Sequence, residues 1–231
     1  MKQLLSIFIC VVFLTLSAQA QITWRGTVSS SGLSTDEVGK GLKEALSQGT
    51  KLATDKASLK DGFFKNPLIF IPFPADAKKV EQRLRSMGLG KQVDQFILTL
   101  NRAAEESAKK AAPIFLNAIT KLTIADAMAI LQGGNGAATS YLRSNTEAQL
   151  TREFMPIIQA ALNQTAATKY WRDLVSTYNR LPMVQKVNPN LDQYACSKAL
   201  NGLFTLVTEE ENKIRSNPAA RVSDLLRRVF K

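Results

Sequence analysis

The chain has 231 residues and a formal net charge of +11, with 30 Lys and Arg against 19 Asp and Glu, no histidine and two cysteines. The absence of histidine excludes Ser-His-Asp and Cys-His catalysis and His-ligated zinc, and two cysteines are too few for a thiolate metal cluster. The apolar content of 45% and the moderate charge content favour a folded chain, long enough for one large domain or two small ones. Any catalysis would therefore rest on carboxylates, Lys, Tyr or Ser.

Residues 1–20 have the three parts of a secretory signal peptide: Lys2, an apolar run at 4–16, and a final Ala-Gln-Ala. The run is shorter than the about 20 residues that a membrane-spanning helix needs. The bulky Ile9 before Cys10 does not suit a lipoprotein signal. We therefore predict an exported, periplasmic protein without a lipid anchor or a later transmembrane segment. An uncleaved N-terminal anchor, a buried helix and acylation at Cys10 are the alternatives.

The remainder divides into a flexible polar leader at 21–33 and a single helical domain at 34–231, because no repeat or linker interrupts the pattern. We predict an all-α fold of roughly eight helices, with a short two-stranded β element as the one open alternative. Cleavage would leave Cys196 as the sole cysteine, so no intramolecular disulfide could form. Its helical surroundings predict a buried, inert thiol.

Ser34 and Glu37 form a capping box that predicts a helix to about residue 57. Three prolines exclude a helix from the segment at 63–74, and its large apolar side chains are too many for a solvated loop. We predict an extended segment or short strand along the core with both faces buried. Pairing with a loop at 183–190 would make the two-stranded element.

Apolar residues at helical spacing continue after this segment. A second helix ends at Gly88, and we predict that its core-facing side chains are Val80, Leu84 and Met87. A long helix over 93–122 is bent or ended by Pro113. Thr123 then caps a short helix with Asp126 in its first turn. Beyond it we expect a turn at 133–136 and helices over 137–144, from Thr146 through Pro156, over 168–181, over 191–215, and from Asn217-Pro218 to the C-terminus.

The last of these helices is amphipathic. Its apolar stripe comprises Val222, Leu225, Leu226, Val229 and Phe230, and its basic face Arg221, Arg227, Arg228 and Lys231. We predict that it docks on the core with the basic face in solvent. Docking on anionic lipid is the alternative.

Carboxylates supply the first candidate site. Glu105 and Glu106 point about 100° apart on a helix and each precedes a lysine by four residues, which favours solvated ion pairs. The same spacing joins Glu209 to Lys213 and Glu211 to Arg215. The alternative is a buried polar or catalytic cluster built from Asn101, Arg102, Glu105 and the region of Glu210.

The Gly-Gly-Asn-Gly turn at 133–136 supplies the second candidate. It has no Gly-Lys-Ser/Thr and no preceding strand, so it is not a phosphate-binding P-loop. A plain helix–helix turn is favoured. Because glycines before a helix expose amides to anions, the alternative is an anion-binding or ligand-binding loop with four nearby candidates: Asn135, Thr139, Tyr141 and Arg143.

Five blocks of sequence carry a family resemblance: GLKEAL at 41–46, DGFFKNPLIFIPFP at 61–74, NRAAEESAKKAAPIF at 101–115, TIADAMAILQGGNGAATSYLR at 123–143 and KALNGLFTLVTEEENKIRSNPAARVSDLLRRVF at 198–230. Together they resemble the bacterial exported family catalogued as domain of unknown function 4197. The resemblance implies a mainly helical, usually exported domain without an assigned activity, so it transfers no catalytic residue. Many members resemble lipoproteins, and this chain departs from them in lacking a suitable acylation motif.

We expect a non-enzymatic periplasmic binding or envelope-associated protein, with no cofactor, no metal and no nucleic-acid partner. Export and positive charge favour an anionic envelope component or lipid, and no nucleic-acid-binding motif is present. An apolar or lipid-like ligand would lie between the segment at 63–74 and the long helices, with Arg102, Arg143 or Arg215 at its anionic head.

Two alternatives remain open at this stage. A carboxylate-based hydrolase of an envelope polymer would require Glu105 or Glu210 to face another acid across a cleft. A structural or assembly partner would carry an exposed apolar patch.

Overall fold

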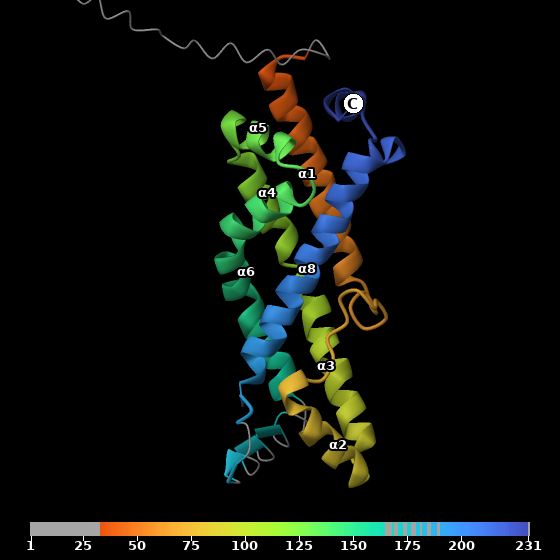
Figure 1. Cartoon of the computed structure of the whole chain (residues 1–231), viewed down its shortest axis with the longest axis vertical. Coiled ribbons are helices and arrows are strands. Elements are labelled where there is room, and N and C mark those ends of the chain that lie inside the picture. The colour runs from red at the N-terminus through yellow and green to blue at the C-terminus, as the bar shows by residue number, and fades with distance from the viewer. Residues whose placement is uncertain are drawn as a thin grey trace, which may run out of the picture. The chain divides into compact units, whose positions relative to one another are not determined.

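The computed structural model describes residues 33–164, 168, 171–172, 175–176, 179–180, 182–183, 186–188 and 190–230. Within these residues eight α-helices and two 3₁₀ helices have described bounds and no residue lies in a strand, which confirms the all-α prediction (Figure 1). The elements are α1 (Thr35–Ser58), η1 (Ala75–Ala77), α2 (Lys78–Ser86), α3 (Gly90–Ala108), α4 (Ala111–Thr120), α5 (Ile124–Gln132), α6 (Ala137–Asn163), α8 (Leu191–Ser216), η2 (Pro218–Ala220) and α9 (Asp224–Val229).

Several predictions concern residues outside the described part. They are the signal peptide at 1–20, the leader except for Leu33, and Lys231. Of the helix predicted over 168–181, the described residues up to Asn179 are helical. No single helix in the described residues is long and apolar enough to span a membrane, and α4 and α5 satisfy that criterion only as a pair bent by 108°.

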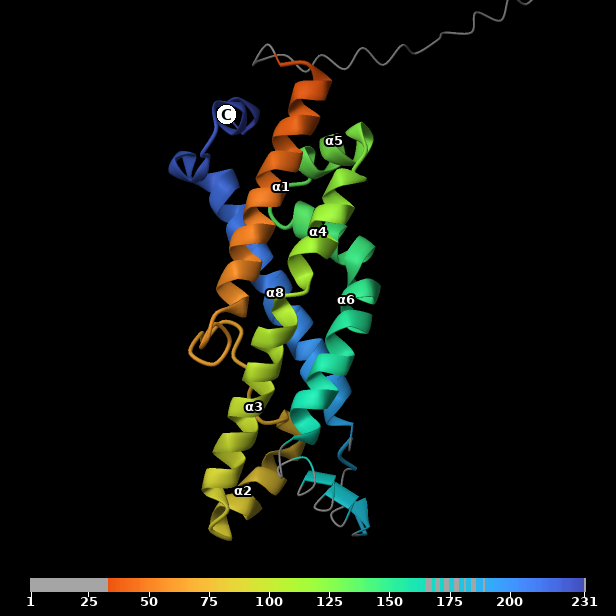
Figure 2. The same cartoon turned by 180° about the vertical axis from the view of Figure 1, so that it is seen from behind.

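The core forms around an antiparallel pair of long helices, α6 and α8. The start of α6 lies beside the second half of α8, where the Ala138 N–H donates to Glu211, and its end lies beside the first half, where Gln159 donates to Asp192. Helix α1 packs against α8, and α3 packs against both α6 and α8 further along the pair (Figures 1 and 2). The largest fully buried side chains are Phe63, Phe115, Phe154 and Phe204.

The predicted N-terminal caps of α1 and α5 are confirmed. Ser34 accepts from the Glu37 N–H while the Glu37 carboxylate accepts from the Ser34 N–H. Thr123 and Asp126 make the same reciprocal pair. Helix α8 also agrees with its predicted range. Local side chain–backbone hydrogen bonds determine these helix starts, which is why a short stretch of sequence predicts them.

The long helix predicted over 93–122 is two helices, and the break comes before Pro113. Helix α3 ends at Ala108, and Pro113 sits in the first turn of α4, where its missing N–H is not needed. Helix α2 ends in a Schellman motif at Gly88, whose φ is +81°. That turn directs Met87 outward, so its predicted core position is wrong.

Two helices predicted on either side of Thr146 are one continuous helix, α6. The Thr146 hydroxyl donates to the Leu142 carbonyl within the helix instead of capping a new one. Pro156 also lies inside α6. A fully buried apolar stripe at four-residue spacing stabilises the helix on both sides of the proline. The stripe comprises Leu150, Phe154, Ile158 and Leu162.

The segment at 63–74 is irregular, and only one of its faces is buried. Its inward side chains are Phe63, Ile69, Ile71 and Phe73, whereas Leu68 is 60% and Phe70 37% exposed. The prediction of two buried faces is therefore wrong. A Cβ at Gly202 of α8 would lie 2.7 Å from the Phe63 ring, so this glycine allows the close packing.

In the described residues no β-pairing joins this segment to the loop at 183–190. Asparagine side chains instead hydrogen-bond to backbone N–H and carbonyl groups of both segments. Asn101 binds the N–H and the carbonyl of Ile71 at 2.9 Å each. Asn179 does the same for Val187 at 2.8 Å each. Each amide side chain supplies the donor and acceptor that a partner strand would otherwise supply.

The C-terminal helix α9 docks on α1 with Leu226 fully buried and Arg227 and Arg228 exposed, which confirms its predicted mode of packing. Asn217 caps η2 instead of the final helix, and Ser223 caps α9. Two side chains depart from the predicted pattern. Val222 is 66% exposed, and Arg221 is buried, donating to the Ile214 and Arg215 carbonyls at the end of α8.

Cys196 is 2% exposed, as the sequence predicts, and burial raises the pKa of its thiol from 9.0 to about 11. Because the folded state retains the proton, this contribution to stability is complete below about pH 9 and is lost as the pH rises toward about 11. At about pH 8 we expect a disulfide reagent to modify Cys196 only after unfolding in guanidinium. Rapid modification of the folded protein would contradict the assignment.

Candidate functional site

An open groove of about 1060 Å³ lies between α3 and α6, bordered by the end of α1. Ligand pockets typically enclose about 300–1,000 Å³, so the groove can hold a lipid-sized molecule. Its lining combines two kinds of surface. Helix α6 contributes mainly apolar residues, namely Pro156, Ile157, Ala160 and Ala161, whereas the cations lie on the opposite side, namely Lys60, Arg102, Lys109 and Lys110.

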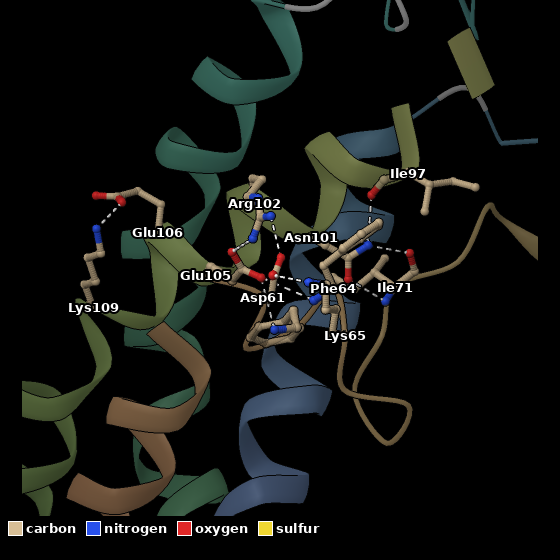
Figure 3. A network of polar contacts seen from close by, with 11 residues as sticks. Asp61, Phe64, Lys65, Ile71, Ile97, Asn101, Arg102, Glu105, Glu106 and Lys109 are labelled. Atoms are coloured by element: carbon tan, nitrogen blue, oxygen red, sulfur yellow. Dashed lines mark hydrogen bonds and ion pairs between the residues drawn. The ribbon is translucent and has the colours of Figure 1, made fainter. Parts of the chain in front are cut away.

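At one edge of the groove, Arg102 joins two carboxylates (Figure 3). Its guanidinium donates to Glu105 Oε2 at 2.6 Å and to Asp61 Oδ1 at 2.5 Å. Glu105 Oε1 accepts from the N–H groups of Phe63 and Phe64 at 3.1 and 3.2 Å. Glu105 therefore binds the start of the irregular segment through Oε1, while Oε2 holds Arg102 of its own helix.

The turn after α1 brings these partners together. Asp61 has a φ of 68°, a left-handed conformation that aspartate tolerates better than most residues. A Cβ at Gly62 would lie 2.3 Å from the Lys56 carbonyl, so only glycine fits the next position. Hydrogen bonds from Lys65 and then Arg102 lower the pKa of Asp61, and the hydrogen bond to Glu105 raises the pKa of Arg102.

Asn101 completes this network one residue away. It is fully buried, and in addition to Ile71 it donates to the Ile97 carbonyl of its own helix at 2.8 Å. Asn101, Arg102 and Glu105, which the sequence offered as the alternative to solvated ion pairs, therefore anchor the segment at 61–71, with Asn101 and Glu105 buried and Arg102 partly exposed. The predicted solvated pair of Glu105 with Lys109 is wrong, because Lys109 pairs with Glu106.

The region of Glu210 does not join this cluster. Glu210 pairs with Lys213 on α8, and Glu209 pairs with Lys56 instead of the predicted Lys213. The predicted pair of Glu211 with Arg215 is confirmed at 3.0 Å, and both side chains are largely buried. Of the four pairs predicted from four-residue spacing, Glu211 with Arg215 is the one that forms among the described residues, and it is buried instead of solvated.

The glycine turn at 133–136 leads into a helix N-terminus that the chain's own carboxylate occupies. Glu211 accepts from the Ala138 N–H at 3.1 Å and from the Thr139 N–H and hydroxyl at 2.9 and 2.8 Å. Arg215 donates to Glu211 and to the Ile130 carbonyl near the end of α5. Glu211 thus fills the position that an external anion would take in the alternative interpretation, and the arrangement agrees with the favoured plain helix–helix turn.

The other candidates near this turn lie apart from the groove. Asn135 is exposed in the turn, and the Tyr141 hydroxyl donates to Asp126 at 3.4 Å. Burial, followed by the charge of Asp126, raises the pKa of Tyr141. Arg143 donates to Glu147 and stacks 4.3 Å from the Phe204 ring centroid, in a separate hollow of about 240 Å³.

Of the arginines proposed to meet a ligand head, Arg102 alone lines the large groove. Sequence reasoning missed Lys60, Lys110 and Ile157, because the groove forms between helices distant in sequence.

Two apolar cavities, beneath α9 and beside Trp171, measure only about 20 and 30 Å³. Among the described residues no group of three or more Asp, Glu or Cys side chains is placed to hold a metal ion.

Comparison with known proteins agrees with the resemblance seen in the sequence blocks. No curated protein and no solved structure matches the chain. A family described as "Protein of unknown function (DUF4197)" matches residues 32–231, which include all the described helices. The chain therefore belongs to the DUF4197 family.

Proposed function

We propose that this chain is a non-enzymatic, exported envelope protein that binds an anionic amphiphile in the groove between α3 and α6. The observation that carries the proposal is the division of the groove into an apolar side on α6 and a cationic side. A single-chain lipid with a phosphate or carboxylate head matches both sides.

The cationic side retains charge that the chain does not neutralise. Arg102 and Lys109 bind Asp61, Glu105 and Glu106. Lys60 and Lys110 are exposed and form no ion pair within the described part of the chain. A lysine carries a compact charge on a flexible apolar stem, which suits contact with a phosphate at the edge of an apolar groove.

The apolar side suits the tail of such a ligand. Ile157 and Ala161 of α6 line the groove and are each only partly buried, as is Leu98, an apolar residue of α3 in the same lining. Covering partly exposed apolar surface stabilises a complex by roughly 25 cal/mol per Å² before the costs of association. The groove therefore offers separate contacts for the tail and for the head.

The same geometry disfavours the hydrolase alternative. Both oxygens of Glu105 already accept hydrogen bonds from this chain. Glu106 lies on the same helix, and the residues that line the groove from α6 include no carboxylate. A two-carboxylate mechanism needs acids on both sides of the scissile bond, so binding explains this arrangement better.

Decyl phosphate, used as a monomer, is the first probe for this proposal. We expect it to bind more tightly than decanol or inorganic phosphate. In isothermal titration calorimetry, Lys60→Ala/Lys110→Ala should weaken its binding about tenfold, since loss of about 1.4 kcal/mol has that effect. Lys79→Ala/Lys121→Ala removes the same charge from exposed positions outside the groove and should change the affinity little. Equal affinities of the two double variants would refute the assignment of the head site.

A steric variant tests the tail site independently. Ala160 is exposed and lines the groove, so Ala160→Trp should fill part of it and abolish decyl phosphate binding while leaving the circular dichroism spectrum unchanged. Ala148→Trp places the same ring at an exposed position on α6 outside the groove and serves as the control. Unaltered binding by Ala160→Trp would place the tail elsewhere.

A further inference from the structure

The irregular segment between α1 and α2 presents a second surface, distinct from the groove. Along 68–73, buried side chains alternate with exposed ones, yet the exposed residues are also apolar: Leu68, Phe70 and Pro72. We call these three the apolar face. A solvated face normally carries polar residues, and a group of exposed apolar residues marks an interaction site.

Aromatic and cationic side chains surround the apolar face. The Phe70 ring lies 6.0 Å from the Phe64 ring, and the Arg102 guanidinium lies 5.7 Å from the Phe64 ring centroid. On the other side, the Tyr194 hydroxyl donates to the Pro72 carbonyl at 3.0 Å, and the Lys198 ammonium lies 5.8 Å from the Tyr194 ring. Aromatic rings together with lysines are typical of surfaces that meet lipid headgroups.

The backbone here does not suit an added peptide strand. Pro67, Pro72 and Pro74 have no N–H to donate, and Asn101 already binds both polar groups of Ile71. A second copy of the chain is also disfavoured. Three exposed side chains are few for a dimer that buries about 800 Å² per partner, and two chains of charge +11 repel each other.

From these observations we infer that the apolar face docks on an anionic phospholipid bilayer, with Leu68 and Phe70 inserted among the headgroups. Lys198 is exposed and has no carboxylate partner among the described residues, so it can bind a lipid phosphate. The net charge of +11 attracts the chain to an anionic surface before insertion. This inference goes beyond the proposed function, since the apolar face lies outside the groove lining.

Vesicle flotation tests the inference with the full chain. Wild type should float with vesicles of equal phosphatidylcholine and phosphatidylglycerol, and bind at least about tenfold less to phosphatidylcholine alone or in about 0.5 M salt. Leu68→Ser/Phe70→Ser should lose at least about tenfold in affinity. Met87→Ser/Leu116→Ser removes two other exposed apolar side chains and should bind like wild type. Equal binding by both double variants would overturn the inference.

A site-specific reporter guards against misfolded variants. Wild type already contains Trp24 and Trp171, so its emission is subtracted from that of Phe70→Trp. The difference spectrum should shift to shorter wavelength on anionic vesicles, and an unchanged difference spectrum would count against insertion. A wild-type dimer that Leu68→Ser/Phe70→Ser abolishes would assign the face to a second copy instead. Ala160→Trp should still float, and Leu68→Ser/Phe70→Ser should still bind decyl phosphate, so failure of either proposal can be recognised separately.

Discussion

Glu105→Ala should lower the free energy of unfolding by about 3–5 kcal/mol, because three donors lose their acceptor and each such loss at a buried position costs about 1–3 kcal/mol. The carboxylate is 6% exposed and binds the Phe63 and Phe64 N–H groups as well as Arg102. Its removal leaves two amides and a guanidinium nitrogen without their acceptors. A buried donor left without an acceptor costs more free energy than an average hydrogen bond contributes to stability.

The adjacent Glu106 is the matched control for this prediction. It is exposed and pairs with Lys109, so Glu106→Ala should cost less than about 1 kcal/mol. Urea unfolding followed by circular dichroism would measure both variants. Glu105→Gln keeps one acceptor oxygen and should fall between them. Equal loss from the two alanine variants would show that the Glu105 network does not anchor the segment.

The sequence predicted the fold class, the caps of α1 and α5 and most helix positions, because those features depend on residues a few positions apart. Glu105 and Glu106 show where such local reasoning fails. Each precedes a lysine by four residues, yet Glu105 turns toward the Phe63 and Phe64 amides, about forty residues earlier in the chain. Nothing within one helical turn distinguishes the two glutamates.

The groove and the apolar face were difficult to predict for a related reason. The groove forms where α3 and α6 approach each other, and neither helix alone indicates which lysines will line it. For the segment at 63–74, the abundance of apolar residues correctly predicted contact with the core. It could not show that Leu68 and Phe70 would remain outside, because the Asn101 bonds to Ile71 determine which face turns inward.

Glu211→Ala should lower the free energy of unfolding by about 3–5 kcal/mol as well, for a different combination of reasons. Glu211 fills the N-terminus of α6, where it accepts from Ala138 and from Thr139 and interacts favourably with the helix dipole. It also neutralises Arg215, whose side chain is only 12% exposed. One substitution therefore removes a helix cap and leaves a largely buried cation without its carboxylate.

Thermal unfolding would detect this loss as a fall in Tm of about 6–20 °C, since 1 kcal/mol corresponds to about 2–4 °C in a chain of this size. Glu209→Ala, two residues earlier, breaks a partly exposed pair with Lys56 and should lower Tm by no more than a few degrees, about 2–4 °C. A shift for Glu211→Ala as small as that of Glu209→Ala would contradict the prediction.

A double-mutant cycle separates the two roles of Glu211. Arg215 retains its hydrogen bonds to the Ile130 and Leu131 carbonyls when Glu211 is lost, so its guanidinium stays buried beside an empty position. Adding Arg215→Met to Glu211→Ala removes that unpaired charge but leaves the Ala138 and Thr139 amides without an acceptor. We therefore expect a coupling of about 1–3 kcal/mol between Glu211 and Arg215, with the double variant still less stable than wild type. Additive losses would mean that Glu211 stabilises the protein as the cap of α6 alone.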